Sequence, residues 1–266
     1  MHSSFDFRKA LIASASALLV LLLVVPLLAL VVRSIETRAW EQPAGSGIAE
    51  AILLSIFTTS ITTIVTLLLG TPLAYSLARW SFPGKRLLSV LVELPIVLPP
   101  AVAGLALLVA FGRRGFLGPT LQSLGIILPF STTAVIIAQI FISSPFYVRA
   151  AQVGFQGIDA EIEDAGRVDG AGGFALFWNI TLPLSRRALA AGLALSWARA
   201  LGEFGATILF AGSLQGRTQT MPLLVYRVFE SNINAAIWTG LLLIGMALVA
   251  LLFSQWLNRK SAQNPS

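Results

Sequence analysis

The sequence contains no cysteine and a single histidine, His2. The chain therefore has no disulfide, no thiolate nucleophile and no iron–sulfur cluster, and it cannot build a zinc site from His and Cys ligands. We expect no metal site, no cofactor and no catalytic residue. Charged residues make up only 11% of the 266 residues, whereas soluble domains carry about 25%. A soluble enzyme is excluded by this scarcity, and an all-α integral membrane protein is predicted.

A phosphate-binding loop is also missing. The pattern G-x-x-x-x-G-K-[ST] does not occur, and the one Gly-Lys pair, Gly84-Lys85, is followed by Arg86. The chain therefore does not bind ATP in the P-loop manner. The energy for any transport must come from a partner chain or from an ion gradient.

Hydrophobic residues account for 56% of the sequence, and the mean hydropathy is +0.83. A helix needs about 20 apolar residues to cross a bilayer, and six segments fit: 10–32, 51–78, 87–112, 131–148, 188–211 and 235–257. The stretch Gly115–Phe130 contains Gly118-Pro119 and Leu128-Pro129, so we expect a short interfacial or re-entrant piece there. The prediction is one polytopic transmembrane domain over residues 1–266.

The net charge of +6 arises from 18 basic and 12 acidic residues. With both termini in the cytoplasm, eleven basic residues fall on the cytoplasmic side, six outside, and Arg199 within a span. The positive-inside rule therefore favours this orientation. It also explains the charge without a nucleic-acid partner.

The longest cytoplasmic connection, residues 149–187, is the least apolar part of the chain. A helix is predicted to begin at Asp159, a good N-cap residue, and to end at Asp169-Gly170. A second short helix is predicted over 174–180, closed by Thr181-Leu182-Pro183, so that the loop is a helix–turn–helix. Three aromatic residues lie on or near its surface, and they favour either docking of a soluble partner or contact with lipid headgroups. These are Phe174, Phe177 and Trp178.

This loop resembles the cytoplasmic motif of binding-protein-dependent ABC importer permeases: Glu-Ala-Ala, three residues, Gly, nine residues, Ile-x-Leu-Pro. The matching positions are Asp164, Ala165, Gly166, Gly170, Ile180, Leu182 and Pro183. Asp164 stands for the Glu and Gly166 for the second Ala. The resemblance implies that these residues, with the three aromatic ones, couple the chain to a cytosolic ATPase.

Other segments narrow the resemblance to the molybdate-type permease subunits, with sulfate permeases as close relatives. They are Arg79–Arg86, Glu93–Pro100, Ala200–Thr207 and Gly216–Pro222. The family implies a permease homodimer in the plasma (inner) membrane, two copies of an ATP-binding subunit and an extracytoplasmic oxyanion-binding protein.

Charged residues inside predicted spans generally face a bundle interior or a water-filled cavity. Arg199 and Glu203 are four residues apart and can pair on one helix face. This pair either lines the anion path or only fixes helix packing. Glu93 lacks a basic residue on its own span, so it either snorkels to the cytoplasmic end or meets a base on another span. We assign Glu93, Arg199, Glu203 and Thr207 to the translocation path or gate.

Several alternatives stay open. Molybdate, tungstate and sulfate are all tetrahedral dianions, and the sequence does not separate them. An ion-coupled secondary transporter would show two related halves with interrupted helices, and none are found. A membrane scaffold protein would explain the spans but not the cytoplasmic motif. Copurification of a P-loop ATPase would distinguish the importer from both other classes.

Overall fold

The computed structural model describes residues 7–41 and 47–263, and His2 lies outside these ranges. Within them the chain is helical and contains no strand. The helices are α1 (Phe7–Glu36), η1 (Ala39–Glu41), α2 (Ile48–Arg79), α3 (Lys85–Val97), α4 (Pro100–Phe111), α5 (Gly118–Ser123), α6 (Thr132–Gln156), α7 (Ala160–Val168), α8 (Gly173–Leu176), the π-helix η2 (Phe177–Thr181), α9 (Leu182–Leu201), α10 (Gly205–Phe210), α11 (Met221–Phe229) and α12 (Ile233–Gln263). The all-α prediction is confirmed.

Four described helices are long and apolar enough to cross a membrane: α1, α2, α6 and α12. A fifth span results if α3 and α4 are counted together, although they are bent by 118°. The 20-residue helix α9 is not among these candidates, and it carries Arg186, Arg187 and Arg199. The described helices thus support four or five spans by length and composition, where the sequence predicted six.

The predicted span 87–112 is not one continuous helix. α3 ends at Val97, Leu98 and Pro99 have extended ψ angles near 133°, and α4 begins at Pro100. Proline has no N–H to donate and disfavours helical geometry in the residue before it. The consecutive prolines at 99 and 100 therefore divide the segment into two helices.

The predicted span 188–211 does not coincide with one helix either, because α9 begins at Leu182 and ends at Leu201. Three residues, Gly202–Phe204, separate it from α10. The expected closure of a short helix at 181–183 does not occur either, since α8, η2 and α9 follow one another without a gap. The wider π turn explains this continuity: the N–H of Leu182 bonds to the carbonyl of Phe177, five residues back, just before Pro183.

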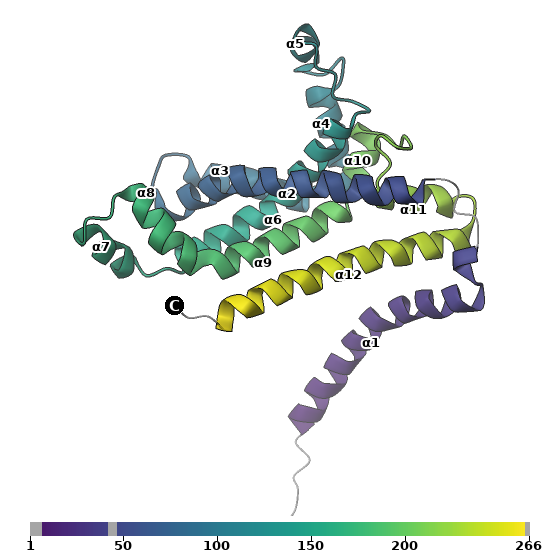
Figure 1. The fold of residues 1–266 in the computed structure, drawn as a ribbon, viewed down its shortest axis with the longest axis horizontal. Helices are drawn as coiled ribbons and strands as arrows, with labels where there is room; N and C mark the ends of the chain where they lie inside the picture. Colours follow the sequence, from purple (N-terminus) through teal and green to yellow (C-terminus); the bar gives the residue numbers. More distant parts are fainter. Residues whose placement is uncertain (1–6, 42–46, 264–266) are drawn as a thin grey trace, which may run out of the picture.

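α2, α6 and α9 run side by side and form the centre of the bundle (Figure 1). They approach closely at small residues. A Cβ added to Gly154 would lie 2.5 Å from Ala188 Cβ, one added to Gly192 would lie 2.7 Å from Ala150 Cβ, and one added to Gly70 would lie 2.9 Å from Tyr147 Cδ1. Small residues at such crossings allow the tight packing that holds helices together in lipid.

The remaining helices lie around this centre. α4 packs on α10 and α6 through a cluster that includes Leu107, Ile142 and Phe210, and α11 packs on α12 through Leu224 and Val228. α1 leans away from the bundle (Figure 1), and its most apolar window has none of its residues buried inside the chain. α1 therefore presents apolar surface to lipid or to another protein chain.

Candidate coupling segment and buried charges

The segment between α6 and α9 protrudes from one end of the bundle, at the left of Figure 1, where α2 ends and α3 begins. α7 follows Asp159, whose side chain makes no capping hydrogen bond. α7 ends before Gly170, which has a φ of 90°. Because this left-handed conformation is unfavourable for residues with a Cβ, glycine suits the turn between α7 and α8.

The motif residues of α7 divide between two faces. Asp164 and Ala165 are exposed, and Asp164 forms an ion pair with Arg167. Gly166 is buried, and a Cβ added there would lie 2.5 Å from Ile180 Cδ1 and 3.0 Å from Leu176 Cδ1. The glycine that departs from the family pattern is therefore the residue that lets α7 rest directly on α8 and η2.

The three aromatic residues expected to dock a partner do not act as one group. Phe177 is partly buried against the bundle, with ring centroids 5.3 Å from Tyr75 and 6.2 Å from Phe155. Phe174 and Trp178 are exposed and stack on each other at 6.1 Å. Phe177 is thus partly buried against α2 and α6, whereas Phe174 and Trp178 are exposed.

Phe174, Phe177 and Trp178 line a cavity of about 650 Å³ together with residues of α2. Its walls are almost wholly apolar and include Leu67, Leu68 and Pro72 of α2 together with Phe174 and Trp178. Leu67 and Leu68 are exposed on a helix apolar enough to span a membrane. Because tryptophan favours the membrane–water interface, this arrangement favours headgroup contact for Phe174 and Trp178.

The sequence interpretation missed the residues that define the outward face of α7. Ile162 and Val168 are exposed, Val168 to 87%. We call the exposed residues Ile162, Asp164, Ala165 and Val168 the α7 face. The spacing of three residues between Ile162, Ala165 and Val168 could have been recognised from the sequence, but the interpretation relied on the aromatic residues that follow.

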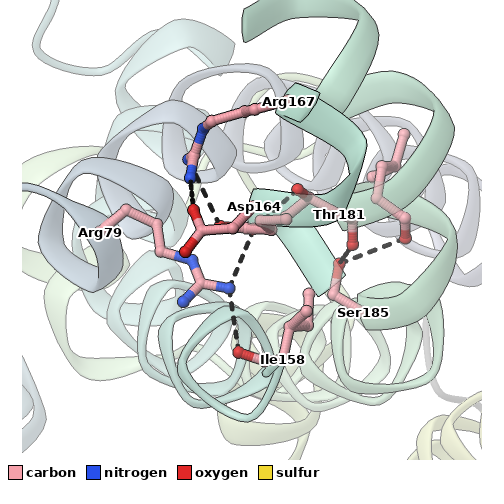
Figure 2. Close-up of polar contacts among 8 residues, drawn as sticks. Arg79, Ile158, Asp164, Arg167, Thr181 and Ser185 are labelled. Atoms are coloured by element: carbon pink, nitrogen blue, oxygen red, sulfur yellow. Dashed lines mark hydrogen bonds and ion pairs between the residues drawn. The ribbon is translucent and has the colours of Figure 1, made fainter. Parts of the chain in front are cut away.

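Glu163 was also missed, although it is the most connected charged residue of the segment. It is 3% exposed. Its Oε1 accepts hydrogen bonds from Arg79 Nη2 and from Thr181 Oγ1, both at 2.9 Å; Figure 2 labels these two donors. Arg167 Nη2 lies 3.8 Å from Oε2. No sequence pattern indicates that Glu163, rather than Glu161 or Asp164, is the buried acid.

The predicted pair of Arg199 and Glu203 is present, with Nη1 and Oε2 2.8 Å apart. Glu203 is 1% exposed and follows the end of α9, and its Oε1 accepts a hydrogen bond from the backbone N–H of Ala206 at 2.8 Å. Thr207, one residue further, is buried, and its Oγ1 has no hydrogen-bond partner among the described residues. The pair therefore lies at the break between α9 and α10.

Glu93 meets a base on another helix, one of the two alternatives that the sequence left open. Its Oε1 is 3.0 Å from Nη1 of Arg149 on α6. Both side chains are about half exposed. The structure does not bring Glu93 into contact with Arg199, Glu203 or Thr207 through any ion pair or hydrogen bond of the described residues.

Buried hydroxyl groups along α2 form a further polar feature that was not predicted. Ser55, Thr58, Thr59, Thr62 and Thr66 are all buried. Thr62 Oγ1 donates a hydrogen bond to Gln139 Oε1 of α6 at 3.1 Å, and Ser55 Oγ accepts one from the N–H of Met221 at 2.8 Å. Such bonds stabilise helix contacts in an apolar environment.

Comparison with known proteins gives this geometry its context. Residues 69–263 match the family described as "Binding-protein-dependent transport system inner membrane component". The Escherichia coli (strain K12) molybdenum transport system permease protein ModB is 40% identical over 80% of this chain and 95% of its own length. ModB of Mycobacterium tuberculosis is 39% identical over 95% of both chains. The sulfate transport system permease protein CysW of Synechococcus elongatus is 36% identical over 82% of this chain and 76% of its own.

Solved structures share the fold at low sequence identity. A bacterial alginate ABC transporter in complex with its periplasmic protein superposes with a TM-score of 0.78 at 15% identity, covering 97% of this chain and 96% of the other. The MetNI methionine ABC transporter gives 0.61 at 14% identity, covering 81% and 94%. The chain belongs to the family of binding-protein-dependent inner-membrane transport components, and it is a permease subunit of an ABC importer, similar to the molybdenum and sulfate permeases.

Proposed function

We propose that this permease imports molybdate, or a related tetrahedral oxyanion, by coupling a membrane path to ATP hydrolysis in separate cytosolic subunits. The observation that carries the coupling is the α7 face, which projects from the end of the bundle with an acid and apolar side chains exposed. Val168 is 87% exposed and is therefore accessible to a partner. Contact with a partner gives this face a function.

Coupling can be tested with two substitutions in the assembled transporter. Val168→Asp should leave inserted protein and stability unchanged, because exposed substitutions alter stability by less than about 0.5 kcal/mol. It should nevertheless lower the transport obtained per ATP hydrolysed, since a charge replaces an apolar contact. Val168→Ala is the matched control. Transport per ATP that is unaffected by Val168→Asp would contradict docking through the α7 face.

The second substitution, Trp178→Ala, separates the two interpretations of the aromatic residues. If Trp178 fills a cleft in the ATPase, its loss should uncouple hydrolysis from transport, because buried aromatic anchors dominate such interfaces. If Trp178 lies in the interface of the bilayer, coupling should survive. Both measurements use reconstituted vesicles and are normalised to inserted protein.

The choice of molybdate rests on the molybdenum permeases, which are about 40% identical over most of the chain. Sulfate is the second candidate, because a sulfate permease is 36% identical. Uptake of radiolabelled molybdate by vesicles containing permease, ATPase and binding protein should be inhibited by tungstate more strongly than by sulfate. Sulfate uptake that molybdate does not inhibit would reverse the assignment.

The functional unit is proposed to be a homodimer with two ATPase copies, both termini in the cytoplasm and the anion path at the dimer axis. One chain carries a single α7 face, whereas ATP-driven closure needs two facing nucleotide sites. The unburied apolar surface of α1 leaves room for a second copy. Because the chain has no cysteine, single introduced cysteines can be crosslinked in membranes without background. A functional transporter with a single permease copy would contradict this proposal.

A further inference from the structure

Glu163 touches three parts of the chain at once. It belongs to α7, it binds Arg79 at the end of α2, and it binds Thr181 at the junction of η2 and α9. Its Oε1 accepts both bonds, so that Arg79 and Thr181, which are labelled in Figure 2, share one carboxylate oxygen. The contacts join residues that are 84 and 18 positions apart in the sequence.

Arg79 holds the entry to α7 as well as its body. Its Nη2 also donates a hydrogen bond to the carbonyl of Ile158 at 3.2 Å, in the turn between α6 and α7. A buried charge is tolerated only when it is paired and hydrogen-bonded. Since both charges of this pair are largely removed from water, α7 cannot shift relative to α2 without breaking the pair.

The Thr181 contact attaches α7 to the helix that follows the coupling segment. Thr181 is fully buried, and its carbonyl accepts a hydrogen bond from Ser185 Oγ at 2.8 Å. It is the last residue of the π-helix η2, a conformation that is rare and is frequently found at functional sites. Together with the close approach of Gly166 to Ile180, this contact makes α7 and the start of α9 one packed unit.

The neighbouring acid, Asp164, has none of these properties. Its side chain is 67% exposed, and among the described residues it forms an ion pair with Arg167 alone. The two carboxylates are adjacent in the sequence, so they provide a matched pair of variants. Asp164 faces outward with the α7 face, whereas Glu163 faces the bundle.

We propose that Glu163 is a positioning residue that fixes α7 to α2 and α9, so that movement of the docked α7 face is transmitted to the transmembrane helices. This inference rests on the proposed function for its consequence in transport. The attachment itself belongs to the permease and can be measured without any ATPase. Arg79 and Thr181 are the partners through which it acts.

The attachment can be measured as a distance within the full-length permease. Cysteines replacing Trp80 and Val168, both exposed, carry spin labels without background because the chain has no cysteine. Labelled protein is diluted with unlabelled protein in nanodiscs to suppress distances between copies. Glu163→Gln should broaden the distance distribution, whereas Asp164→Asn should leave it as narrow as in the otherwise unchanged chain.

Arg79→Met should broaden the distribution as Glu163→Gln does, and the double variant should broaden it no further, because contacting residues are not additive. Equal broadening by Glu163→Gln and Asp164→Asn, an unchanged distribution in Glu163→Gln, or additive broadening in the double variant would each overturn the proposal.

The consequence is measured as substrate transported per ATP hydrolysed in the assembled transporter, normalised to inserted protein. Glu163→Gln should lower this ratio about two- to thirtyfold, the range of coupling changes caused by residues between two sites, and Glu163→Asp, which keeps the charge, should restore part of it. A purely structural role would reduce inserted protein and leave the ratio unchanged. Broadened distances with an unchanged ratio would support the attachment and contradict docking through α7. If Glu163→Gln leaves the distance distribution narrow while Val168→Asp uncouples transport from hydrolysis, docking through the α7 face is supported and the attachment by Glu163 is contradicted.

Discussion

The carboxylates of Glu163 and Glu203 are both almost completely buried, yet they connect different parts of the chain. Glu203 is paired with an arginine four residues earlier, whereas Glu163 is paired with an arginine 84 residues away. The Arg–Glu distances are nearly equal, 2.8 Å and 2.9 Å. Similar burial and similar Arg–Glu distances therefore do not imply a similar role. The role depends on which helices the two residues of the pair belong to.

The pair of Arg199 and Glu203 lies at the break between α9 and α10. Glu203 binds the N–H of Ala206 as well as Arg199, so the carboxylate joins the end of α9 to the first turn of α10. The pair at Glu163 joins α7 to α2 and α9. The first pair therefore links two consecutive helices, whereas the second links helices that are distant in the sequence.

The largest effect is expected when Arg199 is replaced by glutamine. Glu203 would keep only the N–H of Ala206, and removing one partner of a buried pair costs about 3–5 kcal/mol. The melting temperature in detergent and the amount of inserted protein should both fall. Glu203→Gln should be milder, because the amide oxygen can still accept the bond from Ala206.

Transport by these variants decides whether the pair also belongs to the anion path. If it does, Arg199→Gln should block uptake, and Glu203→Gln should slow release or raise the apparent affinity for the anion. If the pair only fixes packing, both single variants should lose assembly, and the double variant with neutral residues should recover it. A fully active double variant would eliminate the role in the path.

A smaller effect is expected for Arg79→Gln, although the pair it breaks is also buried. Glu163 would keep the hydroxyl of Thr181 and could draw Arg167 closer from 3.8 Å. The loss should be about 1.5–3 kcal/mol, the value of hydrogen bonds to charged groups. Arg149→Gln is the control: its pair with Glu93 is half exposed, so the loss should stay below about 1 kcal/mol. Equal losses in the two variants would show that burial does not distinguish these pairs.

The same contrast explains how much could be predicted from the sequence. The pair of Arg199 and Glu203 follows from a spacing of four residues, and the coupling segment follows from a motif with fixed spacing. The all-helical fold follows from composition. Glu163 could not be identified, because its partner depends on how α2 packs against the turn before α7, and no local pattern encodes that arrangement.

The helix boundaries predicted from hydropathy were wrong where proline or a π turn determines the backbone geometry. The apolar run 87–112 gave no indication that Pro99 and Pro100 would bend the chain by 118° rather than kink it slightly. The π turn at 177–181 removed the expected stop at Pro183. The α7 face was overlooked because Val168 is a smaller apolar residue than the three aromatic ones that follow it, of which Phe177 is partly buried against Tyr75.

The smallest effect on stability is expected for Asp164→Asn, and this variant tests most directly whether Asp164 and Glu163 have different roles. Asp164 and Arg167 are both more than half exposed, and exposed pairs contribute about 0–1 kcal/mol, an amount that salt screens further. The melting temperature should therefore change little, while the apparent affinity for the ATPase should fall and lose part of its dependence on ionic strength. These quantities can be compared with those of Glu163→Gln, one residue away on the same turn. If Asp164→Asn destabilises the permease as much as Arg79→Gln does, then the exposed acid shares the structural role. In that case the division of α7 into an outward face and an inward attachment is wrong.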